Sequence, residues 1–419
     1  MGRKVHFVGR TFLNGLVLTF CWAPFGLVGG AAVVGRGSFV SVKKIRRRSG
    51  LLQDHMPPSA AGRGIFAALS SSASADSVCA LLASHTPIDA KLASHALHCL
   101  GRVVRPLDRA AEIASCIAEL TRALLAAKLT LDSRELSKAA WGIGKLWPTV
   151  AHSPATSDAA LRALRSLAVS AAAAADSLDA QAAASILHAC GTVGSASAIS
   201  RPAMRALQHR AAVLAAASRC SPQDVANVLW AMARLGASVD EALAESLGEA
   251  LLALLPRFKP MELSSTAWAL AKAPIFPPRD LERLIGAMHG ALGGGGGDGG
   301  KGGDGGKGGD GGKGGDGKGK GKGKGKGENA LLRGLSAQGA ANVLWAFARC
   351  EPPPPLPLVE ALLEQATRQA GGLTAQGLAN VCSACAKMHG PPAACVHLLE
   401  RSGAIEALGA ADVGALAAV

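Results

Sequence analysis

A repeated phrase constrains this chain more than any other feature of its sequence. Residues 221–236 read SPQDVANVLWAMARLG, residues 336–350 read SAQGAANVLWAFARC, and residues 374–388 read TAQGLANVCSACAKM. Weaker copies cover residues 88–103, 131–146, 178–194 and 259–273. A phrase that returns along a chain is the signature of a repeat array, so each copy is expected to form part of one structural unit.

The spacing of the copies predicts a helical hairpin for each unit. We take the residue at the position of Trp230 as the anchor, and the seven anchors are Leu97, Trp141, His188, Trp230, Trp268, Trp345 and Ser383. The intervals between them are 44, 47, 42, 38, 77 and 38 residues. A period of about 40 residues is typical of helical solenoids. The predicted fold is therefore all-α, an α-solenoid (superhelix) of about seven helical-hairpin repeats of 38–47 residues, interrupted by one Gly/Lys-rich loop.

The phrase itself predicts an amphipathic helix. Ser221 suits the N-cap, Pro222 the first helical position and Gly236 the C-terminal stop. At 100° per residue one side is apolar, and it carries Val225, Val228, Leu229, Met232 and Leu235. Amphipathic segments between the later copies predict the second helices of the hairpins, at residues 158–175, 201–217, 239–255, 279–292 and 356–369. Two further helical segments, at residues 77–83 and 107–128, are expected around the first copy.

The opposite face of the phrase carries the candidate functional residues. Relative to the anchor, positions −7, −3 and +4 share its face, and in the first copy they hold Ala90, Ser94 and Gly101. An amide or hydroxyl, a ring and a cation in each repeat suit single-stranded RNA, whose bases stack on rings and whose phosphates meet cations. The candidates are Gln223, Asn227, Trp230, Arg234, Gln338, Asn342, Trp345, Arg349, Gln376, Asn380, Lys387, Ser265, Lys272, Lys138 and Lys145. The alternative is structural: Trp packs between repeats, Asn bridges loops and Lys extends into water.

These motifs resemble a known family. The phrase SPQDVANVLWAMARLG, with its echoes SAQGAANVLWAFARC and SSTAWALAKA, is similar to the octotricopeptide repeat and to the related repeats of RAP-domain and FAST-kinase-like proteins. The resemblance covers roughly residues 80–419. It implies an organellar RNA-binding solenoid that acts in the processing, stability or translation of transcripts. The repeat lengths vary, and residues 408–419 are expected to begin a further motif helix, which makes a longer protein with a C-terminal module such as a nuclease one alternative.

The net charge of +14 does not by itself predict a nucleic-acid surface. Residues 1–50 hold nine Lys/Arg and no acid, and residues 294–327 hold eight Lys and four Asp. Subtraction leaves 44 − 17 = 27 basic and 30 − 4 = 26 acidic residues for the rest of the chain. An RNA surface in the repeats must therefore be a local stripe of charge.

Composition divides the chain into five regions. Residues 1–35 form a signal-like hydrophobic targeting segment, and residues 36–75 form a basic, Ser/Ala-rich, transit-like region. Together they predict import into a plastid, or into the mitochondrial matrix, with a retained membrane anchor as the alternative. Helical repeats follow at 76–292 and 330–419, separated by a Gly/Asp/Lys linker at 293–329 that is expected to be disordered.

No catalytic or cofactor motif stands out. Cys382 and Cys385 form a CxxC pair with Cys395 and His397 downstream, but they occupy core positions of the motif helix, which favours packing over zinc. The scattered cysteines favour a reducing compartment over a disulfide scaffold. We expect a protein that is not an enzyme, has no cofactor and no small-molecule substrate, and binds single-stranded organellar RNA, with other RNA-processing proteins as further partners. The alternative is a protein-interaction scaffold of the armadillo or HEAT type.

Overall fold

The computed structural model of the chain describes residues 58–85, 87–104, 110–126, 131–293, 329–388 and 392–402. The chain divides into two units, Met1–Met56 and Pro57–Val419, and every described residue belongs to the second. The predicted targeting segment, residues 36–57 of the transit-like region, residues 294–328 of the linker and residues 403–419 lie outside the described residues. The described residues contain helices and no strand.

The seven copies of the phrase form seven helices, which we call the anchor helices. They are α3 (Ala90–Val103), α5 (Ser133–Val150), α7 (Ala180–Val193), α9 (Pro222–Leu235), α11 (Pro260–Lys272), α14 (Ala337–Phe347) and α16 (Ala375–Lys387). Each anchor helix packs against the next one in this order, from α3 to α16. The anchor helices therefore form one continuous layer.

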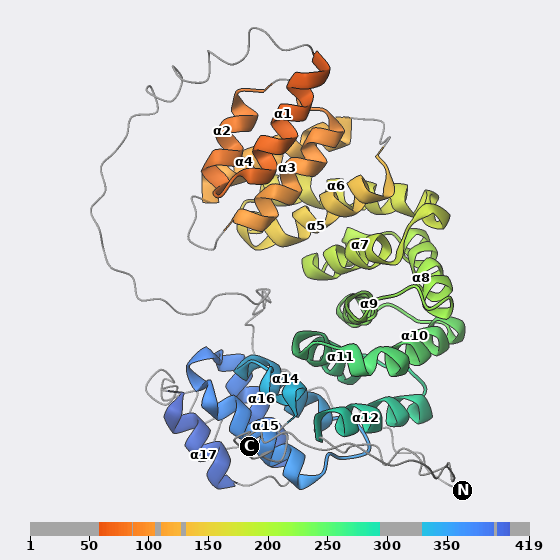
Figure 1. The fold of residues 1–419 in the computed structure, drawn as a ribbon, viewed down its shortest axis with the longest axis vertical. Coiled ribbons are helices and arrows are strands. Elements are labelled where there is room, and N and C mark those ends of the chain that lie inside the picture. The colour runs from red at the N-terminus through yellow and green to blue at the C-terminus, as the bar shows by residue number, and fades with distance from the viewer. Residues whose placement is uncertain are drawn as a thin grey trace, which may run out of the picture. The chain divides into compact units, whose positions relative to one another are not determined.

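A second layer is formed by the partner helices, one after each anchor helix. They are α4 (Ala110–Ala126), α6 (Pro154–Ala173), α8 (Arg201–Ala216), α10 (Glu241–Leu254), α12 (Pro278–Gly293), α15 (Leu356–Arg368) and α17 (Pro392–Arg401). They also pack in series, α4 on α6 and so on to α15 on α17 (Figure 1). Two parallel layers of alternating helices are the architecture of an α-solenoid, which confirms the predicted fold class. Short 3₁₀ turns, such as Ala175–Ser177 and Leu255–Arg257, lead from a partner helix to the next anchor helix.

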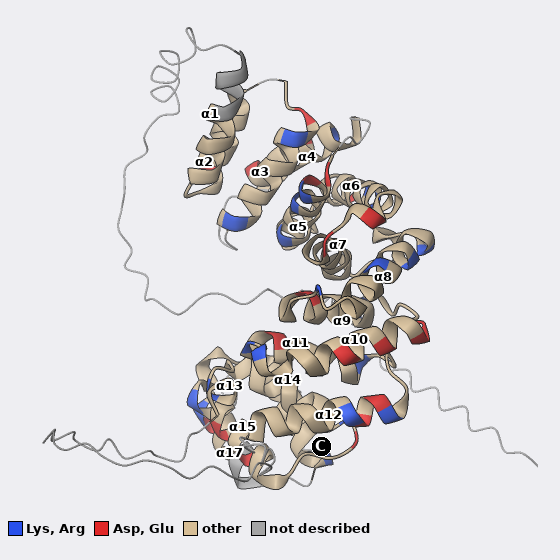
Figure 2. Cartoon of the chain, turned by 45° about the vertical axis from the view of Figure 1, so that its right-hand side comes forward, with Lys and Arg blue, Asp and Glu red and all other residues tan. Residues whose placement is uncertain are grey.

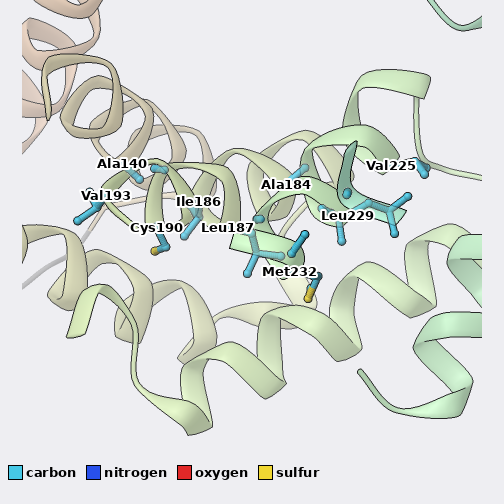
Figure 3. Packing of buried hydrophobic residues seen from close by; sticks show 14 of the residues in the cluster. Ala140, Ala184, Ile186, Leu187, Cys190, Val193, Val225, Leu229 and Met232 are labelled. Atoms are coloured by element: carbon cyan, nitrogen blue, oxygen red, sulfur yellow. The ribbon is translucent and has the colours of Figure 1, made fainter. Parts of the chain in front are cut away.

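The core lies between the two layers and along the seams of the anchor layer. Figure 3 shows side chains of α7 and α9 meeting there, among them Leu187, Cys190, Leu229 and Met232. Of the apolar face predicted from the phrase, Val225, Val228, Leu229 and Met232 are buried, and Leu235 is half-buried. The apolar periodicity of the sequence thus builds the stack, because each repeat buries its apolar side against its neighbours.

The anchor helices begin at a shared capping signal. The N-cap residues are Asp89, Asp132, Asp179, Ser221, Lys259, Ser336 and Thr374. Six of them accept a hydrogen bond from the backbone N–H three residues on, for example from Leu92 N to Asp89 Oδ1 at 2.7 Å. Lys259 has no such oxygen, and its backbone N–H donates to Glu262 Oε2 at 2.7 Å. Gly236 ends α9 in the left-handed conformation, with φ 58°, as the sequence predicts.

Two further features bound the array. Helices α1 (Pro58–Ser71) and α2 (Ala75–Ala83) pack against α3, so the helical unit begins upstream of the predicted boundary at residue 76. Beyond α12, the short helix α13 (Ala330–Arg333) leads into α14, and α11 packs directly on α14. The long interval between the anchors Trp268 and Trp345 thus leaves the anchor layer unbroken. None of the described helices is both long enough and apolar enough to cross a membrane.

Candidate nucleic-acid interface

The four predicted positions of each anchor helix, taken together over the seven anchor helices, are called the stripe, and in α7 and α11 they make up nearly all of the exposed surface of the helix. In α11 the residues from 261 to 270 are buried except at Met261, Ser265 and Trp268, which are positions −7, −3 and 0, and Lys272 at +4 is exposed. The same pattern of exposure recurs in α7, around His188, and in α9, where Gln223 is exposed and Asn227 and Arg234 are half-buried. The helix periodicity therefore places the candidate residues of these helices on one face, although Trp230 on that face is only 5% exposed.

The structure corrects the register of the first copy by one residue. In the other six copies the anchor lies nine residues after the N-cap, as in 230 − 221 = 9. The N-cap Asp89 then makes His98 the anchor, and Leu97 is fully buried. The stripe residues of α3 are accordingly Lys91, His95, His98 and Arg102 in place of Ala90, Ser94, Leu97 and Gly101. The first copy has no Trp at its anchor, so the ring gave no guide to its register. The N-cap Asp89 does give that register, because the anchor lies nine residues after the N-cap.

Basic and acidic residues occupy different positions of the anchor helices. Every Lys and Arg within them falls on the stripe: Lys91, Arg102, Arg134, Lys138, Lys145, Arg234, Lys272 and Lys387. Their only acids, Glu135, Asp224 and Glu262, lie in the first turn and accept the N-cap backbone N–H. These carboxylates stabilise the positive helix end and occupy no stripe position, and Glu135 Oε1 lies 3.6 Å from Nζ of the stripe residue Lys91. The stripe itself is therefore free of acidic side chains.

The partner helices show no such sorting. Helix α10 carries Glu241, Glu245 and Glu249, whereas α8 carries Arg201, Arg205 and Arg210. Some of these charges pair locally, as Arg283 does with Glu249 and Arg162 with Asp158. Figure 2 shows red residues on α10 and both red and blue residues on α12. The near-neutral total charge of the repeats thus hides a basic stripe on one layer and a mixed surface on the other.

Rings at the anchor position contact one another across three seams of the array, and His188 and Trp230 form a stacked pair. The His188 imidazole lies on Trp230, with ring centroids 4.7 Å apart and an interplanar angle of 29°. Trp230 in turn lies 6.4 Å from Trp268, and His98 lies 4.9 Å from Trp141. Glycines make room for this stack, because a Cβ on Gly191 would lie 3.1 Å from Trp230 Cζ3. The anchor rings are therefore part of the seams between repeats.

Three of the cations at position +4 lie over the rings of their own repeats. Lys145 Nζ is 5.7 Å from the centroid of Trp141, Arg234 Cζ is 5.9 Å from that of Trp230, and Arg349 Cζ is 4.8 Å from that of Trp345. Each distance is within the range of a cation–π interaction. The spacing of four residues brings the two side chains together on the helix surface.

The predicted amides behave differently along the array. Gln223 and Gln376 are exposed, but Gln338, Asn342 and Asn380 are buried. Gln338 Nε2 donates to Asn342 Oδ1 at 3.1 Å, and Gln338 Oε1 accepts from Thr374 Oγ1 of the next repeat at 2.8 Å. The amides of α14 thus form an inter-repeat hydrogen-bond network. Those of the earlier copies remain open to a ligand.

Desolvation sets the protonation of the imidazoles on the stripe. Burial, aided by the charge of Lys145, lowers the pKa of His188 to about 4. Burial and then the charges of Lys138 and Arg102 lower the pKa of His98 and of His95, and burial also lowers the pKa of Lys145. His188 is therefore neutral at pH 7, and positive charge on the stripe comes from its Lys and Arg side chains.

The described residues offer no metal centre. No group of three or more His, Cys, Asp or Glu side chains in the described ranges could hold an ion. Cys382 and Cys385 lie in the single helix α16, half-buried and buried, and Cys385 is disulfide-bonded. The disulfide at Cys385 was not predicted from the sequence, which assigned this cysteine to packing. The seven free cysteines of the described residues, including Cys79 and Cys190, do not form a disulfide scaffold.

A family model matches the middle of the array. Residues 152–273 match the family model of the Tbc2 translation factor, N-terminal domain. The matched stretch begins just before α6 and ends just after α11. It contains the anchors His188, Trp230 and Trp268. No curated protein matches the chain. This part of the array is therefore similar to a domain of a translation factor.

Proposed function

We propose that the chain is a single-stranded RNA-binding α-solenoid that acts, without catalysis of its own, in the translation, stability or processing of an organellar transcript. The observation that carries the proposal is the sorting of charge in the anchor layer, where all Lys and Arg lie on the stripe and all acids lie in the caps. A protein does not need this sorting to build a solenoid, because the partner helices also pack in series without it.

The chemistry of the stripe favours RNA as the ligand. A line of cations attracts a polyanion, and neighbouring amides such as Gln223 and Asn227 can hydrogen-bond to base edges. The likeness of residues 152–273 to a translation factor domain supports an RNA or a component of the translation machinery as the partner. Binding along the stripe would protect or remodel the bound segment of a transcript, which needs no catalytic group.

An organellar location is part of the proposal and rests on the sequence. The uncharged stretch from residue 11 to residue 35 and the basic stretch that follows it are typical of a plastid presequence, with a mitochondrial presequence as the alternative. A fluorescent protein fused after residue 75 tests the proposal. Fluorescence in a plastid or in mitochondria supports it, and fluorescence along other membranes contradicts it.

The RNA-binding proposal is tested by charge reversal on the two layers of the full chain. Arg102→Glu, Lys138→Glu and Lys272→Glu together change the stripe, and Arg201→Glu, Arg205→Glu and Arg279→Glu change exposed residues of partner helices by the same charge. We expect the stripe variant to bind a fluorescent uridine oligonucleotide at least about tenfold more weakly than the control, since about three phosphate contacts are lost. Equal loss in both variants, or no binding by the unaltered chain, would refute the proposal.

The alternative of an armadillo- or HEAT-type scaffold gives a different result in cells. Ultraviolet crosslinking followed by purification of the chain should recover RNA if the stripe binds a transcript. A scaffold should recover proteins and no RNA. The basic stripe favours the first outcome, because a surface that docks proteins does not require the exclusion of acids from one layer.

A further inference from the structure

The anchor rings of the stripe are already engaged by protein groups. Trp230 has His188 on one neighbouring repeat and Trp268 on the other, and its side chain is only 5% exposed. Trp141 is in contact with His98 of the preceding repeat and with Lys145, and Trp345 is covered by Arg349. A base that stacked on one of these rings would have to displace a partner. Base stacking is therefore the less favourable use of this surface.

The cations on the rings, in contrast to the rings themselves, are not engaged by a protein group of opposite charge. No carboxylate pairs with Lys145, Arg234 or Arg349 among the ion pairs of the described residues. Arg234 Nε is buried and has no hydrogen-bond partner. These side chains hold positive charge close to the surface without an internal counter-charge, which is the arrangement expected of an anion site.

The rings also determine how the cations are presented. A guanidinium that lies on an indole keeps its N–H groups in its own plane, so the donors remain available to a phosphate from the side. For Arg234 the neighbouring repeat contributes as well, because a Cβ on Gly194 would lie 2.8 Å from Arg234 Nη2. The glycine that ends α7, with φ 68°, thus leaves the space in which the guanidinium rests.

We propose that Lys145 on Trp141, Arg234 on Trp230 and Arg349 on Trp345 are preorganised phosphodiester sites, one in each of three repeats. The array then holds an RNA strand by its backbone, while the rings position the cations and do not stack on bases. This inference rests on the proposed function, since it specifies how RNA would be held. It assigns the ligand chemistry of the stripe to the sugar–phosphate backbone and leaves base recognition to exposed amides such as Gln223.

The first test removes the bases from the ligand. The full chain is titrated against oligodeoxyuridine and against an abasic deoxyribose–phosphate oligomer of the same length, with a uridine oligonucleotide alongside. We expect the abasic ligand to bind within about threefold of oligodeoxyuridine, because both carry the same phosphates. A loss of more than about tenfold would overturn the inference, since stacking of one or two bases accounts for a change of that size.

The second test counts the phosphate contacts. The triple variant Lys145→Gln, Arg234→Gln and Arg349→Gln should reduce the slope of log affinity against log salt by about 2, because each contact to a single strand contributes about 0.7. The control variant Arg201→Gln, Arg205→Gln and Arg279→Gln removes three exposed cations from partner helices and should keep the slope. An unchanged slope in the stripe variant, with unchanged helical circular dichroism, would overturn the inference.

The outcomes separate the inference from the proposed function. If the chain binds no oligonucleotide at about 50 mM salt, where electrostatic binding is strong, the proposed function itself is refuted. Binding that depends on the bases leaves the proposed function intact and removes only the backbone sites. Displacement of the uridine oligonucleotide by an equal concentration of inorganic phosphate would assign the sites to free phosphate, and would also overturn the inference.

Discussion

The seam between α3 and α5 offers a sharp test of how the anchor layer is built. Gly142 lies inside α5 one residue after the anchor Trp141, and a Cβ placed on it would lie 2.6 Å from both the carbonyl carbon and the carbonyl oxygen of Leu97. Ordinary contacts begin at 3.4 Å, so Gly142→Ala requires a shift of 3.4 − 2.6 = 0.8 Å. The atoms in contact are backbone atoms, which cannot rotate away as a side chain would. The whole of α3 must therefore move.

Two opposing effects determine how much Gly142→Ala changes the free energy of unfolding. Alanine is a better helix former than glycine by about 1 kcal/mol. Overpacking a tight seam costs about 1–3 kcal/mol, and contact with backbone places Gly142 at the upper end of that range. We expect Gly142→Ala to lower the free energy of unfolding by about 2 kcal/mol. The matched control is Gly290→Ala in α12, where nothing lies within 4 Å of the added Cβ, and this change should raise stability by about 1 kcal/mol.

Urea unfolding followed by helical circular dichroism measures the difference, which should be about 3 kcal/mol between the two variants. Solenoids can unfold in stages, so hydrogen exchange in α3 and α5 should accompany the titration and show faster opening in Gly142→Ala. Stabilisation by Gly142→Ala comparable to that by Gly290→Ala would refute the close approach of the two helices. It would also refute the placement of His98 against Trp141.

Three other substitutions have defined outcomes. Asp224 accepts from the backbone N–H and the hydroxyl of Ser221 at 2.8 and 2.6 Å, so Asp224→Ala should cost about 1 kcal/mol in urea unfolding. Gln365, 2% exposed, donates from Nε2 to the carbonyls of Leu335 and Arg333 at 2.5 and 3.0 Å, and Gln365→Leu should cost about 1 kcal/mol because the Leu335 carbonyl keeps only its longer bond, 3.3 Å, from Gln369 Nε2. The pKa of His188 is lowered to about 4, so between about pH 6.5 and 4 the unfolded chain binds a proton that the folded chain does not, and stability should fall as the pH falls through that window. His188→Phe should reduce this pH dependence of the unfolding midpoint.

Local signals predicted the helices closely. For the phrase at residues 221–236 the predicted N-cap, first-turn proline and terminal glycine all have the predicted roles, and α9 spans Pro222–Leu235. Predicted partner segments such as 201–217 and 279–292 correspond to α8 and α12 within one residue at each end. These features depend on capping and on a period of 3.6 residues, and both can be recognised within a short stretch of sequence.

Burial of individual stripe residues could not be predicted in the same way. Gln338 and Gln223 occupy the same position of the phrase, yet Gln338 is buried because Thr374 of the following repeat meets its side chain. Trp230 and Trp345 are likewise equivalent in sequence, but Trp230 contacts a ring of each neighbouring repeat, His188 and Trp268. Such differences depend on the neighbouring repeat and on the loops between repeats. The pattern of one copy does not contain that information.

The junction between α12 and α13 has a consequence for how such an array can change in length. The side chain of Asn329 donates to the carbonyl of Ala291, so the two points at which residues 294–328 leave and re-enter the helical unit are held together. Once the ends of a segment are fixed, each doubling of its length costs only about 0.6 kcal/mol in closure entropy. Helix α11 meets α14 as α9 meets α11. The junction is therefore a permissive insertion point, where sequence can be gained or lost while the order of the anchor helices stays the same.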